Sequence, residues 1–119
     1  MKILMVCLGN ICRSPLAEGI LQAKVNSKGL HIKVDSAGTG GWHVGQGPDH
    51  RAVAIANKYG IDISQQQARQ FSSNDFEDFD IIYAMDGSNL SDIVSLANSN
   101  EDIGKVRLIL NEINPEENR

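Results

Sequence analysis

The sequence has only two cysteines, Cys7 and Cys12, and only three histidines in 119 residues. Two cysteines in one short segment do not form the disulfide framework of a small secreted domain. The histidines, His31, His43 and His50, stand apart from one another, and no His or Cys cluster has the spacing of metal ligands. We therefore expect no bound metal and no cofactor.

Runs of basic residues and long apolar segments are also missing. Fifteen Asp and Glu residues outnumber eleven Lys and Arg residues, which gives a formal net charge of −4. A mildly acidic chain without a basic stripe argues against nucleic acid as a partner. The apolar stretch at the N-terminus is too short to cross a membrane and has no cleavage-site pattern. We therefore expect no membrane partner and a cytoplasmic location.

The length of 119 residues and the apolar pattern predict a single α/β domain covering the whole chain. Short buried strands alternate with helices whose apolar residues recur every three or four positions. Gly29 and Gly60 are the predicted stops of the first two helices. This order predicts a four-stranded parallel sheet flanked by helices, with the ligand site beyond the carboxyl ends of the strands. The predicted strands are Ile3–Val6, Leu30–Asp35, Ile81–Ala84 and Val106–Leu110, and the predicted helices are Leu16–Lys28, Asp49–Tyr59 and a segment that ends near Leu96.

The segment between the first strand and the first helix has the composition of an anion-binding loop. It runs Cys-Leu-Gly-Asn-Ile-Cys-Arg-Ser-Pro from residue 7 to residue 15. Ser14 is a favourable N-cap, and Pro15 suits the first helical position because a proline has no N–H to leave unpaired. Gly9 and Asn10 tolerate the left-handed backbone that turns successive N–H groups inward, where the helix dipole favours negative charge. The predicted phosphate-binding residues are Leu8, Gly9, Asn10, Ile11, Cys12 and Arg13.

Cys7 is the predicted nucleophile of this loop. A thiol beside a helix N-terminus, backbone N–H donors and an arginine is expected to be a thiolate at neutral pH, which suits attack on phosphorus. The planar guanidinium of Arg13 can hold two oxygens of the anion, and Ser14 can donate its hydroxyl to the sulfur and ease its later departure. We therefore predict Cys7, Arg13 and Ser14 as catalytic residues. Because a thiolate is oxidised readily, we also expect mild oxidation to form a reversible disulfide between Cys7 and Cys12.

The loop resembles the signature of the low-molecular-weight protein tyrosine phosphatases, and the likeness covers nearly the whole chain. The segments 35–39, 42–49, 60–61, 68–70 and 85–86 also resemble that family, in its order. The resemblance implies hydrolysis of phosphotyrosine-type phosphate monoesters through a phosphocysteine intermediate. It implies a phosphotyrosine protein or an aryl phosphate as the substrate, and inorganic phosphate as a further ligand.

The resemblance also gives roles to residues around the loop. Trp42 matches an aromatic residue that lines the substrate pocket of the family. Ile11 matches a threonine of the related arginine phosphatases, and its apolar surface suits an aryl ring better than a guanidinium group. Asn10, Ser36 and Asp86 are expected to support the loop, and Asp86 also has the position of an N-cap for the helix that follows the third strand.

Two departures from the family pattern are visible. Gln66 stands where many relatives carry a histidine, which removes a proton-sensitive contact to the loop. The general acid of the family is the aspartate of an Asp-Pro-Tyr loop after the fourth strand, and the 119 residues contain no such segment. The chain thus resembles a C-terminally short phosphatase without that loop and without the last helix, and we expect phosphotyrosine to turn over more slowly than activated aryl phosphates. Glu112, Glu116 and Glu117 are the acidic residues near the end, and none lies in a motif that would aim it at the loop.

Three other activities stay open. A chain that keeps the anion cradle without turnover is a phosphate- or phosphotyrosine-binding module, which release of phosphate from a phosphotyrosine peptide would exclude. Arsenate reduction on the same fold relays electrons through further cysteines, and the sequence has none after Cys12. A phosphocysteine carrier of a sugar-transport system does not need Arg13 or the Ser14-Pro15 step, and this sequence has both.

Overall fold

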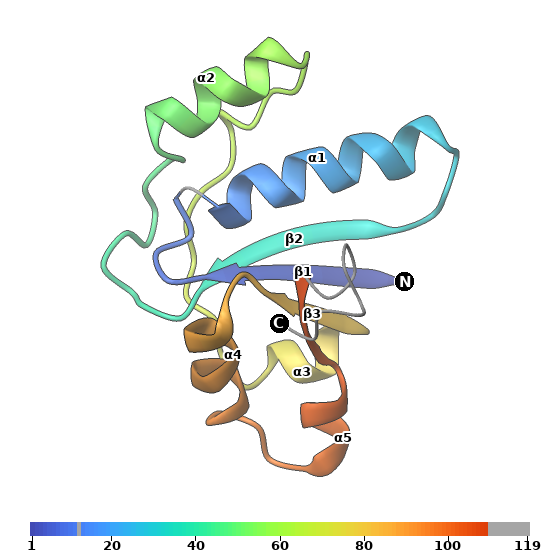
Figure 1. Cartoon of the computed structure of the whole chain (residues 1–119), viewed down its shortest axis with the longest axis vertical. Helices are drawn as coiled ribbons and strands as arrows, with labels where there is room; N and C mark the ends of the chain where they lie inside the picture. Colours follow the sequence, from blue (N-terminus) through green and yellow to red (C-terminus); the bar gives the residue numbers. More distant parts are fainter. Residues whose placement is uncertain (12, 110–119) are drawn as a thin grey trace.

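The computed structural model describes residues 1–11 and 13–109 and contains one sheet with helices on both faces (Figure 1). The strand order is β2-β1-β3-β4, and every neighbouring pair is parallel. The predicted α/β class and the four-stranded parallel sheet are therefore confirmed. None of the helices within these ranges is long and apolar enough to cross a membrane. In chain order the elements are β1 (Lys2–Cys7), α1 (Arg13–Ser27), β2 (Lys33–Gly38), α2 (His50–Lys58), α3 (Asp75–Asp78), β3 (Ile81–Ala84), α4 (Gly87–Val94), α5 (Asn100–Gly104) and β4 (Val106–Leu108).

The larger part of the core lies between the sheet and helices α3 and α4. Successive side chains of a strand point to opposite faces, so Leu4 and Val6 of β1 lie on the same face, and both are fully buried. They pack in one cluster with Phe76 of α3 and Ile93 of α4. Phe71 meets Phe76 edge to face, with ring centroids 5.4 Å apart. Burial of these large side chains provides the main apolar stabilisation of the sheet.

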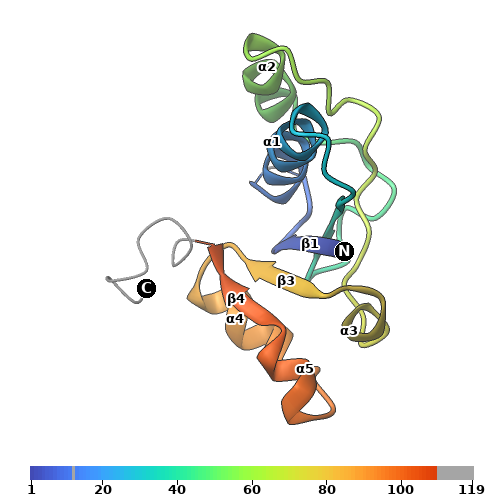
Figure 2. The ribbon, with the colours of Figure 1, turned by 90° about the vertical axis from the view of Figure 1, so that its right-hand side faces the viewer.

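The opposite face of β1 packs against α1. Ile3, Met5 and Cys7 alternate with the residues of the first core and form a second buried cluster with Val34 of β2. Leu21 of α1 packs against this cluster. Figure 2 shows α1 and α2 on one side of the sheet, and α4 and α5 on the other. Strand alternation therefore directs the Cys7 side chain towards the face that carries α1.

Helices α1 and α2 end as the sequence predicts. Gly29 and Gly60 have φ values of 67° and 75°, a left-handed backbone that glycine adopts without a steric penalty. At its start, α2 is capped by Asp49, whose carboxylate accepts the Arg51 backbone N–H at 2.8 Å. Local chemistry thus sets both ends of α2 within one residue of the predicted helix.

The second strand lies further along the chain than predicted. The prediction was Leu30–Asp35, whereas β2 spans Lys33–Gly38. Leu30 lies outside the strand and is half exposed, while Ser36 and Ala37 are buried inside it. Apolar alternation misplaced the strand because Ser36, Ala37 and Gly38 carry little apolar surface, and because pairing with β1 sets the register.

Gly38 explains why β2 must end on small residues. It pairs with Cys7 at the ends of the two strands. A β-carbon at position 38 would lie 2.7 Å from the Leu8 carbonyl oxygen and 3.0 Å from the Asn10 backbone nitrogen. Only glycine lets the end of β2 approach the loop this closely, so the end of β2 packs directly against the backbone of the loop after β1.

The remaining differences concern short elements. Helices α3 and α5 were not predicted, because four and five residues are too few to show an apolar periodicity. Helix α5 begins at a favourable cap, since the Ser99 hydroxyl accepts the Asp102 backbone N–H at 3.2 Å. Helix α4 ends at Val94 rather than near Leu96. Strand β4 ends at Leu108, and the predicted last strand residue, Leu110, lies outside the described residues.

Candidate active site

The loop between β1 and α1 turns at Asn10. Its φ is 58°, and no other non-glycine residue in the described ranges has a positive φ. Of the two residues that tolerate a left-handed backbone, Asn10 adopts it, whereas the φ of Gly9 is not positive. Gly9 instead lies close to His43, because a β-carbon there would lie 3.0 Å from Cδ2 of that ring.

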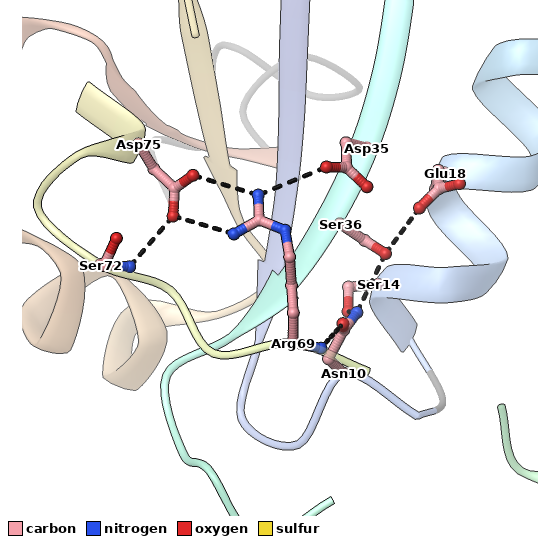
Figure 3. A network of polar contacts seen from close by, with 8 residues as sticks. All are labelled: Asn10, Ser14, Glu18, Asp35, Ser36, Arg69, Ser72 and Asp75. Atoms are coloured by element: carbon pink, nitrogen blue, oxygen red, sulfur yellow. Dashed lines mark hydrogen bonds and ion pairs between the residues drawn. The ribbon is translucent and has the colours of Figure 1, made fainter. Parts of the chain in front are cut away.

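The buried Asn10 side chain joins three parts of the chain (Figure 3). Its amide nitrogen donates to the Ser14 hydroxyl and to the Ser36 hydroxyl, both at 2.9 Å. Its amide oxygen accepts the Arg69 backbone N–H at 3.0 Å. Both amide hydrogens and the amide oxygen are thus used, and these bonds hold the left-handed turn in place.

The Cys7 sulfur lies at the base of this loop. It is 2.9 Å from the Ser14 Oγ, and the Asn10 backbone N–H donates to it at 3.3 Å. Because the Ser14 oxygen already accepts from the Asn10 amide, its own O–H is free to donate to the sulfur. Two donors directed at one buried sulfur suit a thiolate.

The position of Ser14 differs from the prediction. Helix α1 begins at Arg13, so Ser14 lies inside the first turn and is not the N-cap. Its hydroxyl is engaged by Cys7 and Asn10, and both Ser14 and Pro15 are buried. The predicted N-cap role of Ser14 is therefore wrong, and its hydroxyl instead contacts the Cys7 sulfur and the Asn10 amide.

Arg13 is held by Asp86 across the sheet edge. Its Nη1 lies 2.9 Å from Asp86 Oδ2, and about half of the Arg13 side chain is exposed. Asp86 also accepts the Asn89 backbone N–H at 2.8 Å, which is the predicted N-cap contact of α4. The Asn89 N–H and the Arg13 guanidinium lower the pKa of the Asp86 carboxyl below its usual value. One carboxylate therefore links the start of α4 to the guanidinium beside the loop.

Glu18 continues the network behind Ser36 and was missed by the sequence analysis. The Ser36 hydroxyl accepts from Asn10 and donates to Glu18 Oε1 at 2.7 Å. Burial raises the pKa of the Glu18 carboxyl, and the hydrogen bond from Ser36 acts in the opposite direction. A signal was available, because Glu18 follows Ser14 by four positions and such residues share one face of a helix.

Arg69 is the second missed residue, although its segment takes part in the family resemblance. Its guanidinium binds both oxygens of Asp75 at 3.1 Å and reaches Asp35 at 3.3 Å (Figure 3). Burial opposes the charge, but the carboxylates of Asp75 and Asp35 hold the pKa of Arg69 above its usual value. The side chain thus fixes the Arg69 backbone, which donates to Asn10 and accepts the Gly38 N–H at 2.9 Å.

The segment after β2 carries Trp42 to the side of the loop. The Thr39 and Gly40 N–H groups donate to the carbonyl oxygens of Cys7 and Leu8, at 2.9 and 2.8 Å. The Trp42 ring lies against Gly40, where a β-carbon would overlap it, and its side chain is mostly exposed. Trp42 and Leu8 border the same surface hollow. The indole therefore lies beside the loop, and its contact with a substrate stays a prediction.

The remaining residues named in the sequence analysis either make contacts away from the sulfur or lie outside the described ranges. Ile11 is half buried, and its carbonyl accepts the Asp49 N–H at 2.5 Å. Gln66 donates to the Pro15 carbonyl at 3.2 Å rather than to the loop. The described ranges hold no group of three or more His, Cys, Asp or Glu side chains arranged to bind a metal ion. Cys12, Glu112, Glu116 and Glu117 lie outside the described residues.

The fold and the loop together define a class of α/β protein that holds an anion between a strand end and a helix N-terminus, with a cysteine at the base. The family described as low molecular weight phosphotyrosine protein phosphatase matches residues 2–118. The chain belongs to this family.

Individual relatives agree with that family. A putative low molecular weight protein-tyrosine-phosphatase of Synechocystis sp. is 47% identical over 111 residues, which cover 92% of this chain and 70% of the relative. A low molecular weight protein-tyrosine-phosphatase of Bacillus subtilis, YfkJ, is 48% identical over 98 residues, covering 81% of this chain and 63% of the relative. The crystal structure of YfkJ superposes with a TM-score of 0.90 at 41% identity, covering 95% of this chain and 72% of that one. The matched parts thus span about two thirds of the length of these curated relatives.

Proposed function

We propose that this protein hydrolyses phosphotyrosine-type phosphate monoesters through a phosphocysteine at Cys7. The observation that supports the proposal most directly is the setting of the sulfur. It is buried at the base of the loop, with the Ser14 hydroxyl 2.9 Å away and the Asn10 N–H at 3.3 Å. The phosphatase names of the relatives favour turnover over binding alone.

Two displacements at phosphorus make up the reaction. In the first, the Cys7 thiolate attacks phosphorus, the S–P bond forms, and the P–O bond to the phenol breaks with its electron pair going to the phenolic oxygen. In the second, water attacks phosphorus, releases a proton to solvent, and the S–P bond breaks with its electron pair returning to sulfur. The Ser14 hydroxyl stabilises the charge that returns to Cys7 in this second step.

The loop and Arg13 hold the phosphoryl oxygens in both steps. The dipole of α1 favours the charge of the phosphate at the helix N-terminus, and backbone N–H groups of the loop would donate to its oxygens. Asp86 engages only the Nη1 of Arg13 in the contact described above, so Nε and Nη2 are available to two phosphate oxygens. Asp86 acts as a positioning residue, because it directs the guanidinium without itself contacting the phosphate.

The direct test is hydrolysis of p-nitrophenyl phosphate and of a phosphotyrosine peptide. Wild-type protein should release phosphate from both, and Cys7→Ser should release none while still binding inorganic phosphate. Arg13→Lys should bind phosphate more weakly, because an ammonium group cannot hold two oxygens in a planar fork. Hydrolysis retained by Cys7→Ser would refute the assignment of the nucleophile.

A further inference from the structure

Three exposed apolar side chains meet beside the loop. Leu8, Trp42 and Leu96 are 50%, 71% and 44% exposed, and they come from the loop after β1, the segment after β2, and the segment after α4. Single exposed apolar residues are common on protein surfaces, but a group around one depression marks a binding surface. We call this depression the α4 hollow. Its volume is about 310 Å³, and the other residues that line it are Thr39, Gly40, Asp92 and Ser95.

The α4 hollow shares a wall with the candidate active site. Leu8 directly follows Cys7 and is a predicted phosphate-binding residue. Thr39 and Gly40, which also line the hollow, donate their N–H groups to the carbonyls of Cys7 and Leu8. These bonds fix the hollow relative to the sulfur. A phosphorylated residue held at Cys7 would therefore bring its chain neighbours over the hollow.

The charge of the hollow is provided by Asp92 on α4. Its side chain is exposed, and the carboxylate makes no hydrogen bond or ion pair within the described ranges. Asp86, one turn and a half earlier, is instead engaged by Arg13. The hollow thus combines apolar walls with one free negative charge.

We propose that the α4 hollow binds a lysine or arginine side chain that neighbours the phosphotyrosine in the substrate. The aliphatic stem of such a side chain would lie along Leu8 and Leu96, and its cationic end would reach Asp92. The exposed Trp42 ring offers a face to the same cation. This inference rests on the proposed function, because it needs a phosphotyrosine at Cys7 to place the neighbouring residue. It makes Asp92 a determinant of substrate choice.

The experiment compares two phosphotyrosine peptides that differ only in the residues flanking the phosphotyrosine. One peptide has arginine on both sides, and the other has glutamate on both sides. The kcat/KM of wild-type protein is measured for each, and the Kd of each is measured with Cys7→Ser, which binds without turnover. Hydrolysis of p-nitrophenyl phosphate, which has no flanking residues, is measured in parallel as the test of the proposed function.

We expect the arginine peptide to be favoured about two- to fivefold, the range for a solvent-exposed ion pair. The ratio should fall towards one at high salt, because exposed charges are screened. Asp92→Asn should remove the preference, and Asp92→Lys should reverse it. Glu101→Gln removes one negative charge from α5 at a position that does not line the hollow, and it should leave the ratio unchanged.

The outcomes separate the two proposals. If p-nitrophenyl phosphate and both peptides are hydrolysed but the peptides do not differ in rate or in Kd, the inference about the hollow is wrong and the proposed function stands. A preference that survives Asp92→Asn would overturn the inference in the same way. If nothing is hydrolysed but Cys7→Ser binds the arginine peptide more tightly through Asp92, the proposed function fails and the hollow retains its role.

Discussion

The Ser14 hydroxyl oxygen lies 2.9 Å from the Cys7 sulfur, inside the first turn of α1. The same oxygen accepts a hydrogen bond from the Asn10 side chain at 2.9 Å, which leaves the hydroxyl hydrogen available to the sulfur. Ser14, the residue after Arg13, is thus a hydrogen-bond partner of the proposed nucleophile. Removing this hydroxyl tests whether it stabilises negative charge on the sulfur.

Ser14→Ala should slow breakdown of the phosphocysteine more than its formation. The sulfur leaves with a full negative charge in the second step, and a hydrogen bond to a charged group is worth about 1.5–3 kcal/mol, which is roughly a ten- to hundredfold rate effect. Pre-steady-state hydrolysis of p-nitrophenyl phosphate should show a burst followed by a slower steady rate. Ser27→Ala, which removes an exposed hydroxyl at the end of α1, is the matched control. Equal slowing of the burst and the steady rate would contradict this role.

Replacing Asn10 tests the backbone and the side chain separately. Asn10→Ala loses the side-chain bonds to Ser14, Ser36 and Arg69 and forces alanine into a left-handed backbone, which costs about 1–2 kcal/mol by itself. Asn10→Gly loses the same bonds but adopts that backbone freely. In urea unfolding, both variants should be less stable than wild type, and alanine should be the worse by about 1 kcal/mol or more. Equal stability of the two variants would mean that the backbone of residue 10 carries no strain.

Glu18→Gln should change how stability depends on pH. Burial raises the pKa of Glu18 above its ordinary value of 4.5, so the folded state holds this proton more tightly than the unfolded state. Stability from this group therefore falls as pH rises from 4.5 through the higher folded value. Glutamine keeps an oxygen for the Ser36 hydroxyl without the buried charge. The difference between the melting temperature of the variant and that of wild type should increase in favour of the variant across this pH window and then become constant. A difference that does not change with pH would refute the effect.

The sequence predicted the position of the loop between β1 and α1, but not the hydrogen bonds that support it. Strand β3 has the predicted bounds, and Cys7, Ser14 and Asp86 lie at the edge where strand ends and helix starts meet. These features follow from local composition: an apolar run, a turn residue and a cap. Pattern analysis of one sequence detects such features well.

The supports of the loop depend on contacts between distant parts of the chain. Asn10 and Arg69 are 59 positions apart, and Arg69 reaches back across 34 positions to Asp35. No periodicity relates residues so far apart, so Arg69 could not be assigned from spacing. Glu18 shares a helix face with Ser14, but its bond to Ser36 spans 18 positions and shows only in the structure. The error in β2 has a related cause, because Ser36 and Gly38 are placed by their contacts with the distant loop, and Ala37 joins the core with only a small apolar side chain.

Ile11 provides a test of substrate class. Its side chain is half buried and offers apolar surface, which favours an aryl ring over a polar guanidinium group. We expect phosphotyrosine to be hydrolysed faster than phosphoarginine, and Ile11→Thr to narrow the ratio by supplying a hydroxyl. Competition between the two substrates in one assay gives the ratio of kcat/KM directly. Faster hydrolysis of phosphoarginine by the wild-type protein would show that this surface does not select the ring.

The central claim is that Cys7 carries the phosphoryl group, and trapping that intermediate tests it most directly. The substrate should be an aryl phosphate with an acidic phenol, whose oxygen leaves without needing a proton from an acid. Rapid acid quenching followed by peptide mass analysis should find one phosphoryl group on Cys7 in wild type and in Cys12→Ser, and none in Cys7→Ser. A phosphoryl group on another residue, or an undiminished burst of phenol from Cys7→Ser, would contradict the account.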